Sequence, residues 1–166
     1  ADTVCMTATP DVPFNAYLII TNPSSSEVLG VEFSLCHEFF GVESNPLAWL
    51  GVEWQAGSQG EISADWCLDG WAIGFIEPVP QLGDNVILAV LHYMLLADCS
   101  IEFFIGPYPV QTNDDGLPAY LGEGGVVVSL GISSGDPSLP VAAVNGDCNV
   151  VSVESKTFSG LKCLFR

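Results

Sequence analysis

Six cysteines are the residues whose type and spacing most directly predict a chemistry in this chain. They are even in number and widely spaced, and no two of them form a CxxC pair. This pattern favours disulfides in an oxidising compartment over a zinc ribbon or a thioredoxin-type redox site. We therefore expect three disulfides, with their connectivity left open, among Cys5, Cys36, Cys67, Cys99, Cys148 and Cys163.

The sequence offers little that an enzyme needs. It contains no GxSxG, HExxH or phosphate-binding loop, and its two histidines are His37 and His92. His92 falls inside an apolar run, where a packed, hydrogen-bonded histidine is more common than a catalytic base. With 20 Asp and Glu residues, pairs such as Glu53 and Glu61 arise by chance and do not indicate a glycosidase. We predict a protein without catalytic activity.

Two clusters have side chains that suit a ligand. Asn113, Asp114 and Asp115 offer oxygen ligands for calcium, but the further acids of an EF-hand loop are missing, and a plain Asp-Gly turn is the simpler interpretation. Calcium is the one cofactor that the sequence leaves open. Tryptophans that crowd into one region either stack on sugar rings or fill a core, and here they are Trp49, Trp54, Trp66 and Trp71.

β-Strands must position these residues, because helical periodicity is nearly absent. Short aromatic, β-branched or alternating segments are separated by Gly, Pro, Asn and Asp turns, as in an all-β sandwich. The expected strands are 14–21, 28–40, 49–55, 62–67, 71–76, 86–96, 100–105, 126–132, 141–144 and 150–154. We expect hairpins between 86–96 and 100–105 and across Asn145-Gly146, and at most one short helix over 157–164. The prediction is a single antiparallel β-sandwich domain over 1–166, of jelly-roll or cohesin-like type.

One long apolar run, from Val86 to Ala97, needs a place in that sandwich. A transmembrane helix takes roughly 20 apolar residues, so this run is too short to span a membrane as a helix. It is also too uniform for a strand with one wet face. We predict a central strand that is covered on both faces, and no membrane span.

The charge is large and unevenly distributed. The formal net charge is -17, and the only basic residues, Lys156, Lys162 and Arg166, fall in the last eleven positions. Nucleic acid and anionic lipid are therefore unsuited as partners, because both need basic side chains against phosphate. The acidity either simply keeps an extracellular protein soluble or offers a surface on which the basic C-terminal region of another copy docks.

The N-terminal residues 1–13 combine an alternating segment with a linker that contains Pro10 and Pro13. The segment is either an ordinary first strand or a strand donated to the sheet of a neighbouring copy. A head-to-tail contact of that kind does not close, and so it builds a filament. The expected subunit contacts are the basic C-terminal residues together with Val4, Cys5, Met6 and Ala8. The start at Ala1-Asp2 is typical of a terminus left by a signal peptidase, which predicts an extracellular, cell-surface location.

The stretch from Phe14 to Leu96 resembles cohesin-like and carbohydrate-binding-module-like β-sandwiches. The resemblance lies in "FNAYLIITNPSSSEVLGVEFSL", "WLGVEWQAGSQGEISADW" and "GDNVILAVLHYML". The ending "GLKCLFR" is similar to that of small exported proteins from uncultured bacteria. These resemblances imply a sandwich fold and an adhesive or scaffolding role, and they transfer no catalytic residue.

Half of the residues (49%) are hydrophobic, which is more than one compact domain of this size needs to bury. We therefore predict a structural subunit of an extracellular, pilus-like homopolymer or surface layer, joined by β-strand addition. The alternative is a secreted module that binds carbohydrate or a dockerin-like protein, with glycan as its partner.

Overall fold

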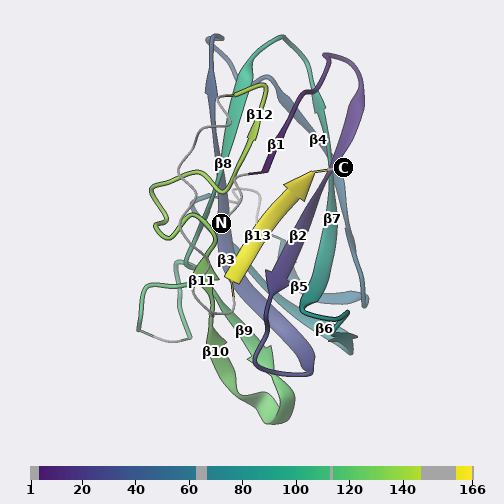
Figure 1. Ribbon diagram of the computed structural model, residues 1–166, viewed down its shortest axis with the longest axis vertical. Helices are drawn as coiled ribbons and strands as arrows, with labels where there is room; N and C mark the ends of the chain where they lie inside the picture. Colours follow the sequence, from purple (N-terminus) through teal and green to yellow (C-terminus); the bar gives the residue numbers. More distant parts are fainter. Residues whose placement is uncertain (1–3, 63–66, 113, 147–159, 166) are drawn as a thin grey trace.

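The computed structural model describes residues 4–62, 67–112, 114–146 and 160–165, with side chains over 4–58, 67–112 and 114–146 (Figure 1). Within these ranges the chain is built from strands, with one short 3-10 turn, η1 (Glu123–Gly125), and no α-helix. The strands are β1 (Val4–Met6), β2 (Pro13–Thr21), β3 (Glu27–Phe40), β4 (Leu47–Trp54), β5 (Ser58–Ile62), β6 (Trp71–Pro80), β7 (Asn85–Leu95), β8 (Ser100–Gly106), β9 (Ala119–Gly122), β10 (Val127–Ser129), β11 (Gly131–Ile132), β12 (Ala142–Val144) and β13 (Gly160–Phe165).

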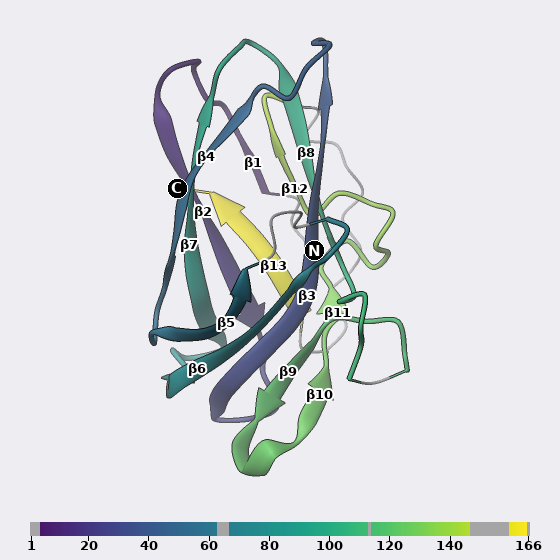
Figure 2. The same cartoon turned by 180° about the vertical axis from the view of Figure 1, so that it is seen from behind.

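Two sheets pack face to face, which confirms the predicted all-β sandwich (Figures 1 and 2). The first sheet has the order β1-β12-β8-β3-β6-β5, and β9 also pairs with β3 and carries β10. The second sheet has the order β11-β13-β2-β7-β4. Most neighbours are antiparallel, but β1 runs parallel to β12, and β11 runs parallel to β13.

Strand β7, formed by the long apolar run, lies between β2 and β4, and so the prediction of a central strand is confirmed. Its inner face is fully buried, whereas the outward side chains of Ile87, Val90, His92 and Met94 are only half-buried. The prediction that both faces are covered therefore holds for the inner face alone. A bulge opposite Leu18 and Ile19 shifts the alternation, so the inward positions do not follow one simple period of two.

Aromatic side chains from both sheets fill the space between them. Trp71 of the first sheet contacts Trp49 and Trp54 of the second sheet, with ring centroids 6.2 and 5.3 Å apart. Tyr93 of β7 contacts Phe103 of β8 at 5.5 Å. Tilted and edge-on rings at these distances add to the free energy of burial, so this cluster fixes how the sheets face each other.

The C-terminal segment differs from its prediction. Residues 160–165 form strand β13, which pairs along its whole length with β2, and not part of a helix. The apolar spacing of Phe158, Leu161 and Leu164 suggested a helix, but a ladder with β2 over all six residues stabilises the extended conformation of the segment. Residues 157–159 lie outside the described residues.

The expected hairpins also need correction. β7 belongs to the second sheet and β8 to the first, so residues 96–99 cross between sheets and form no hairpin. At Asn145-Gly146 the preceding strand β12 has β1 and β8 as its neighbours, and residues 150–154 lie outside the described part of the chain. The strand expected over 126–132 divides at the buried Leu130 into β10 and β11, which belong to different sheets.

No helix among the described residues is long and apolar enough to span a membrane.

The two faces of the second sheet predict a clear contrast between two leucines. Leu91 of β7 is fully buried, whereas Leu50 of β4 is 49% exposed. We expect Leu91→Ala to lower the free energy of unfolding by about 2–5 kcal/mol, because it leaves a cavity in the core. The matched variant Leu50→Ala should cost about 1 kcal/mol or less, because about half of this side chain is already exposed and its removal leaves no cavity in the core. Urea unfolding followed by tryptophan fluorescence measures both, and equal losses would contradict the strand orientation.

Candidate assembly site

The N-terminal segment lies along the end of the first sheet. β1 pairs with β12 in parallel, with Val4 opposite Ala142 and Met6 opposite Val144. β12 then pairs with β8, so β12 connects the N-terminal segment to the body of the sheet. β1 is the last strand of this sheet among the described residues.

Asn145 holds the residues that follow β1. Its backbone N–H donates to the carbonyl oxygen of Met6 at 2.9 Å. Its side-chain Oδ1 accepts the N–H of Ala8, and its Nδ2 donates to the carbonyl oxygen of Ala8, both at 2.9 Å. The Asn145 amide thus offers Ala8 one acceptor and one donor, as the next residue of a strand would.

Two further bonds fix Asn145 itself. Its Nδ2 also donates to the carbonyl oxygen of Cys99 at 3.3 Å, and the Ser100 hydroxyl donates to the carbonyl oxygen of Asn145 at 2.6 Å. Asn145 has φ +53°, a left-handed conformation that asparagine tolerates better than most residues. We call Asn145, with its bonds to Met6 and Ala8, the Asn145 clasp. The bonds to Cys99 and Ser100 connect this clasp to the start of β8.

The side chains of the segment are partly buried. Val4, Cys5 and Met6 are each half-buried, and Met6 and Ala8 pack against the hydrophobic core. Thr7 and Thr9 point to solvent. The segment is thus bound through its backbone as well as through half-buried side chains, and backbone pairing is how an added β-strand is recognised.

A tight turn connects this segment to β2. The N–H of Val12 donates to the carbonyl oxygen of Thr9 at 3.3 Å, and the N–H of Asp11 donates to Leu95 of β7 at 2.8 Å. Asp11 has φ +63°, a left-handed conformation that aspartate tolerates better than most residues but less well than glycine. The turn from Thr9 to Val12 therefore stores at most a little strain beside the docked segment.

The other predicted contact residues are only partly visible. Lys162 lies in β13 opposite Ile19 of β2, while Lys156 and Arg166 lie outside the described residues. β13 packs against β1, so the backbone of the C-terminal strand is next to the N-terminal segment (Figure 1). The docking of basic side chains on a neighbouring copy stays a prediction.

One of the three predicted disulfides is confirmed. Cys36 of β3 and Cys67 are bonded, with their Cα atoms 4.5 Å apart. Cys99 is buried and reduced in this structure, and burial, with a smaller contribution from Asp98, raises the pKa of its thiol. Cys148 lies outside the described residues, and so does the side chain of Cys163.

The tryptophans belong to the core more than to a surface. Trp71 is fully buried, so the prediction of sugar stacking does not hold for it. Trp49 and Trp54 are half-buried and turn their rings toward Trp71, and Trp66 lies outside the described residues. The described rings use much of their surface on one another, which leaves little for a glycan.

The acidic turn shows a structural role. Asp115 accepts the N–H of Leu117 at 3.1 Å and the hydroxyl of Ser129, which connects the turn to β10. Asp114 is exposed, and Asn113 lies outside the described residues. Within the described residues no group of three or more His, Cys, Asp or Glu side chains is arranged to hold a metal ion.

His92 is half-buried on the outer face of β7, where its Nδ1 is 2.9 Å from the side-chain oxygen of Asn15. The ring of His37 lies near those of Phe39 and Phe103. The two histidines are on different sheets, so the structure does not bring them together as a catalytic pair.

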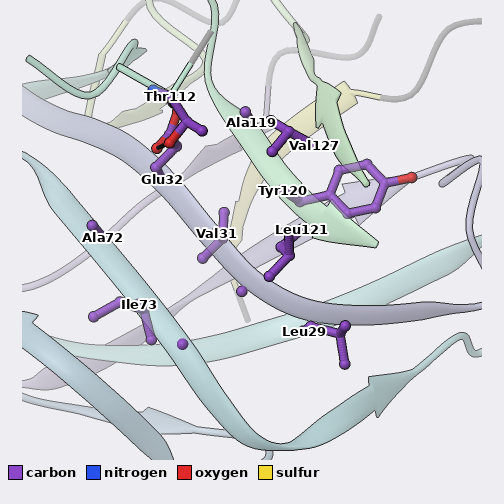
Figure 3. Close-up of a pocket in the computed structure, with 12 residues that line it drawn as sticks. Leu29, Val31, Glu32, Ala72, Ile73, Thr112, Ala119, Tyr120, Leu121 and Val127 are labelled. Carbon is purple, nitrogen blue, oxygen red and sulfur yellow. Dashed lines mark hydrogen bonds between the residues drawn. The ribbon is translucent and has the colours of Figure 1, made fainter. Parts of the chain in front are cut away.

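A surface hollow of about 390 Å³ was not expected from the sequence (Figure 3). It is lined by small and apolar residues of β3, β6 and β9, including Gly30, Gly74 and Leu121. Its carboxylate, Glu32, accepts the N–H and the hydroxyl of Thr112 at 2.9 and 2.6 Å. Both carboxylate oxygens are thus already engaged, so the hollow offers shape and apolar contact and no reactive group.

The Asn145 clasp predicts a local effect of mutation. Asn145→Ala should remove the side-chain bonds to Ala8 and strain the backbone, and so weaken docking of residues 4–8 by about 2–3 kcal/mol. Hydrogen–deuterium exchange of that segment should then speed up at least about tenfold, since 1.4 kcal/mol corresponds to a factor of ten. The matched control is Asn85→Ala, at the exposed start of β7. Equal exchange in the two variants would show that the clasp does not hold the segment.

Comparison with known proteins identifies no relative for this arrangement. No protein-family model matches the chain, and neither a curated protein nor a solved structure is similar to it at a significant level. The resemblance to cohesin-like and carbohydrate-binding sandwiches therefore stays a prediction. What the site does must be argued from its own geometry.

Proposed function

We propose that this protein is a non-catalytic structural subunit of an extracellular homopolymer, in which residues 4–8 of one copy dock beside β12 of the next. The observation that carries the proposal is the Asn145 clasp. It binds the backbone of Ala8 through a donor and an acceptor, at the end of a sheet that a short strand completes. Such a site receives an extended strand whether the strand comes from the same chain or from a neighbour.

Exchange between copies preserves nearly every contact. In a swapped arrangement the ladder of β1 with β12 and the bonds to Asn145 are made between two chains in place of one. Only the turn from Thr9 to Val12 has to open. The linker of residues 9–12 then spans up to about 14 Å, at roughly 3.3–3.6 Å per residue. Because each copy both donates and receives a strand, the contact repeats head to tail.

Opening the turn also releases strain. In the closed turn Asp11 adopts a left-handed backbone conformation. Such a conformation costs most residues with a side chain about 1–2 kcal/mol and aspartate less, and an extended linker recovers that smaller energy. Opening the turn also breaks the hydrogen bond from Asp11 to Leu95. The closed monomer and the strand-exchanged polymer are therefore close in free energy, and the protein concentration determines which of them is populated.

Other features support an exported, assembled protein. The Cys36–Cys67 disulfide fits an oxidising compartment. Several large apolar side chains are exposed, among them Val12, Phe40 and Leu96 at the strand ends near the turn. A neighbour that receives the N-terminal segment would approach this end of the sandwich and cover such side chains. The glycan-binding alternative lacks a comparable feature, because the described tryptophans pack mainly on each other.

Removal of the donor segment provides the first test. We expect the intact protein to form filaments visible by electron microscopy, and a variant lacking residues 1–8 to remain monomeric. A synthetic peptide of residues 1–12 should bind the truncated protein and should block polymerisation of the intact chain, because it fills the acceptor site. The same peptide with Ala8 replaced by proline is the matched control, because proline lacks the N–H that Asn145 accepts.

Two outcomes would contradict the proposal. One is an intact chain that stays monomeric at high concentration and physiological salt. The other is a set of filaments that keep their length and shape after truncation. Binding of the peptide checks that the truncated protein still carries a folded acceptor site, so failure to polymerise is not confused with failure to fold.

The turn gives a second test that keeps the donor segment intact. Asp11→Pro cannot adopt φ +63°, so it should open the turn and raise the polymer fraction. Asp11→Gly removes the left-handed strain, so it should favour the closed monomer, by about 1 kcal/mol or several-fold in equilibrium. Analytical ultracentrifugation over a concentration series measures both. The proposal fails if the two variants shift assembly in the same direction.

A further inference from the structure

We propose that Cys5 and Cys163 form a disulfide that fastens the N-terminal strand to the C-terminal strand. The pairing is inferred from the fold, whereas its role between copies rests on the proposed function. In a polymer joined by strand addition, this bond would connect Cys5 of one copy to Cys163 of the next. The subunits would then be joined covalently as well as by backbone hydrogen bonds.

Elimination narrows the partners of Cys5. With Cys36 and Cys67 bonded, the remaining four cysteines can pair in three ways. Cys5 aligns with Ala143, which aligns with Glu102, and Cys99 precedes Glu102 by three residues. Two strand spacings and three residues of rise place the Cα atoms of Cys5 and Cys99 about 14 Å apart, twice the limit of about 7 Å for a disulfide. When Cys5 is oxidised within one fold, its partner is therefore Cys148 or Cys163.

The strand neighbours favour Cys163. β13, which carries Cys163 opposite Leu18, packs against β1 (Figures 1 and 2). Cys99 lies on the other side of β12 from β1, where the Asn145 side chain donates to its carbonyl oxygen. The packing of β13 on β1 therefore favours Cys163 as the partner of Cys5.

Formation of the bond requires an oxidant. The two thiols lose two protons and two electrons as the S–S bond forms, and the electrons pass to a disulfide such as an exported thiol oxidoreductase or oxidised glutathione. That disulfide is reduced to two thiols. A thiolate of Cys5 or Cys163 attacks the oxidant first, and the resulting mixed disulfide is then displaced by the other cysteine.

The positions of the basic and acidic residues make the bond easy to map. Trypsin cuts after Lys156 and Lys162, and so it releases residues 163–166 with Cys163. A protease that cuts before aspartate releases residues 2–10 with Cys5, 98–113 with Cys99 and, with trypsin, 147–156 with Cys148. After free thiols are blocked with iodoacetamide, we expect mass spectrometry of the unreduced digest to find 163–166 joined to 2–10. Reduction should separate the two peptides.

Two results would overturn the pairing. One is a bond from Cys163 to the peptide of Cys99 or Cys148, and the other is an alkylated thiol at Cys163. Cys5→Ser and Cys163→Ser form a matched pair, and each should leave the other cysteine alkylated while the Cys36–Cys67 bond persists. Because the map is made on the unmodified protein, a variant that fails to fold does not prevent the test.

Mixed isotopes separate this inference from the proposed function. Unlabelled and ¹⁵N-labelled protein are reduced, combined, and oxidised together under assembly conditions. Cys5–Cys163 peptides with one labelled and one unlabelled half support both ideas, and such polymers should resist SDS until reductant is added. If every Cys5–Cys163 peptide is of one isotope and the protein stays monomeric, the disulfide inference is supported and the proposed homopolymer is contradicted. Polymers whose Cys5 and Cys163 are bonded elsewhere would overturn the disulfide alone.

Discussion

Burial of the inner face of β7 against the first sheet is the constraint on which the rest of the structure depends. Tyr93 contacts Phe103 across the core, and the neighbouring Leu91 and Leu95 are fully buried. Because β7 also pairs with β2 and β4, its position fixes the second sheet. The carbonyl oxygen of Leu95, at the end of β7, then holds Asp11 in the turn before β2. The core thus determines where the N-terminal segment leaves the sandwich.

Strands were predicted well where the hydrophobic pattern and the segment length both indicated a strand. They were predicted poorly where the conformation depends on which strand lies alongside. β2, β3, β7 and β8 follow from aromatic, β-branched or alternating segments, because each buries one face. The phase of β7 could not be predicted, since a bulge adds a residue that only the partner strand defines. A helix was predicted in place of β13 because three apolar residues stand at helical spacing. That spacing does not reveal that β2 has an edge on which the segment can pair as a strand.

The candidate site was predicted in part. The N-terminal segment has a recognisable sequence pattern, whereas the asparagine that binds it does not. The segment from Val4 to Ala8 alternates and is followed by prolines, which is enough to suggest a strand with a linker. Asn145 was missed because Asn-Gly is a strong hairpin signal, and a sequence does not show what the asparagine side chain contacts. Its left-handed backbone fits that signal, but the amide binds Ala8, which is distant in sequence. The hollow between β3, β6 and β9 leaves no signal, because segments far apart in the sequence line it.

A clasp that binds mainly backbone raises a question of selectivity, since any extended peptide offers the same N–H and C=O groups. Under the proposed function, three features select the correct segment. The half-buried positions of Val4 and Met6 admit modest apolar side chains, and Ala8 fits where it packs on the core. A cysteine at position 5 adds a bond that other peptides cannot form. Because each copy carries a net charge of -17, weak contacts between copies are opposed, so only a segment that satisfies all three features holds subunits together.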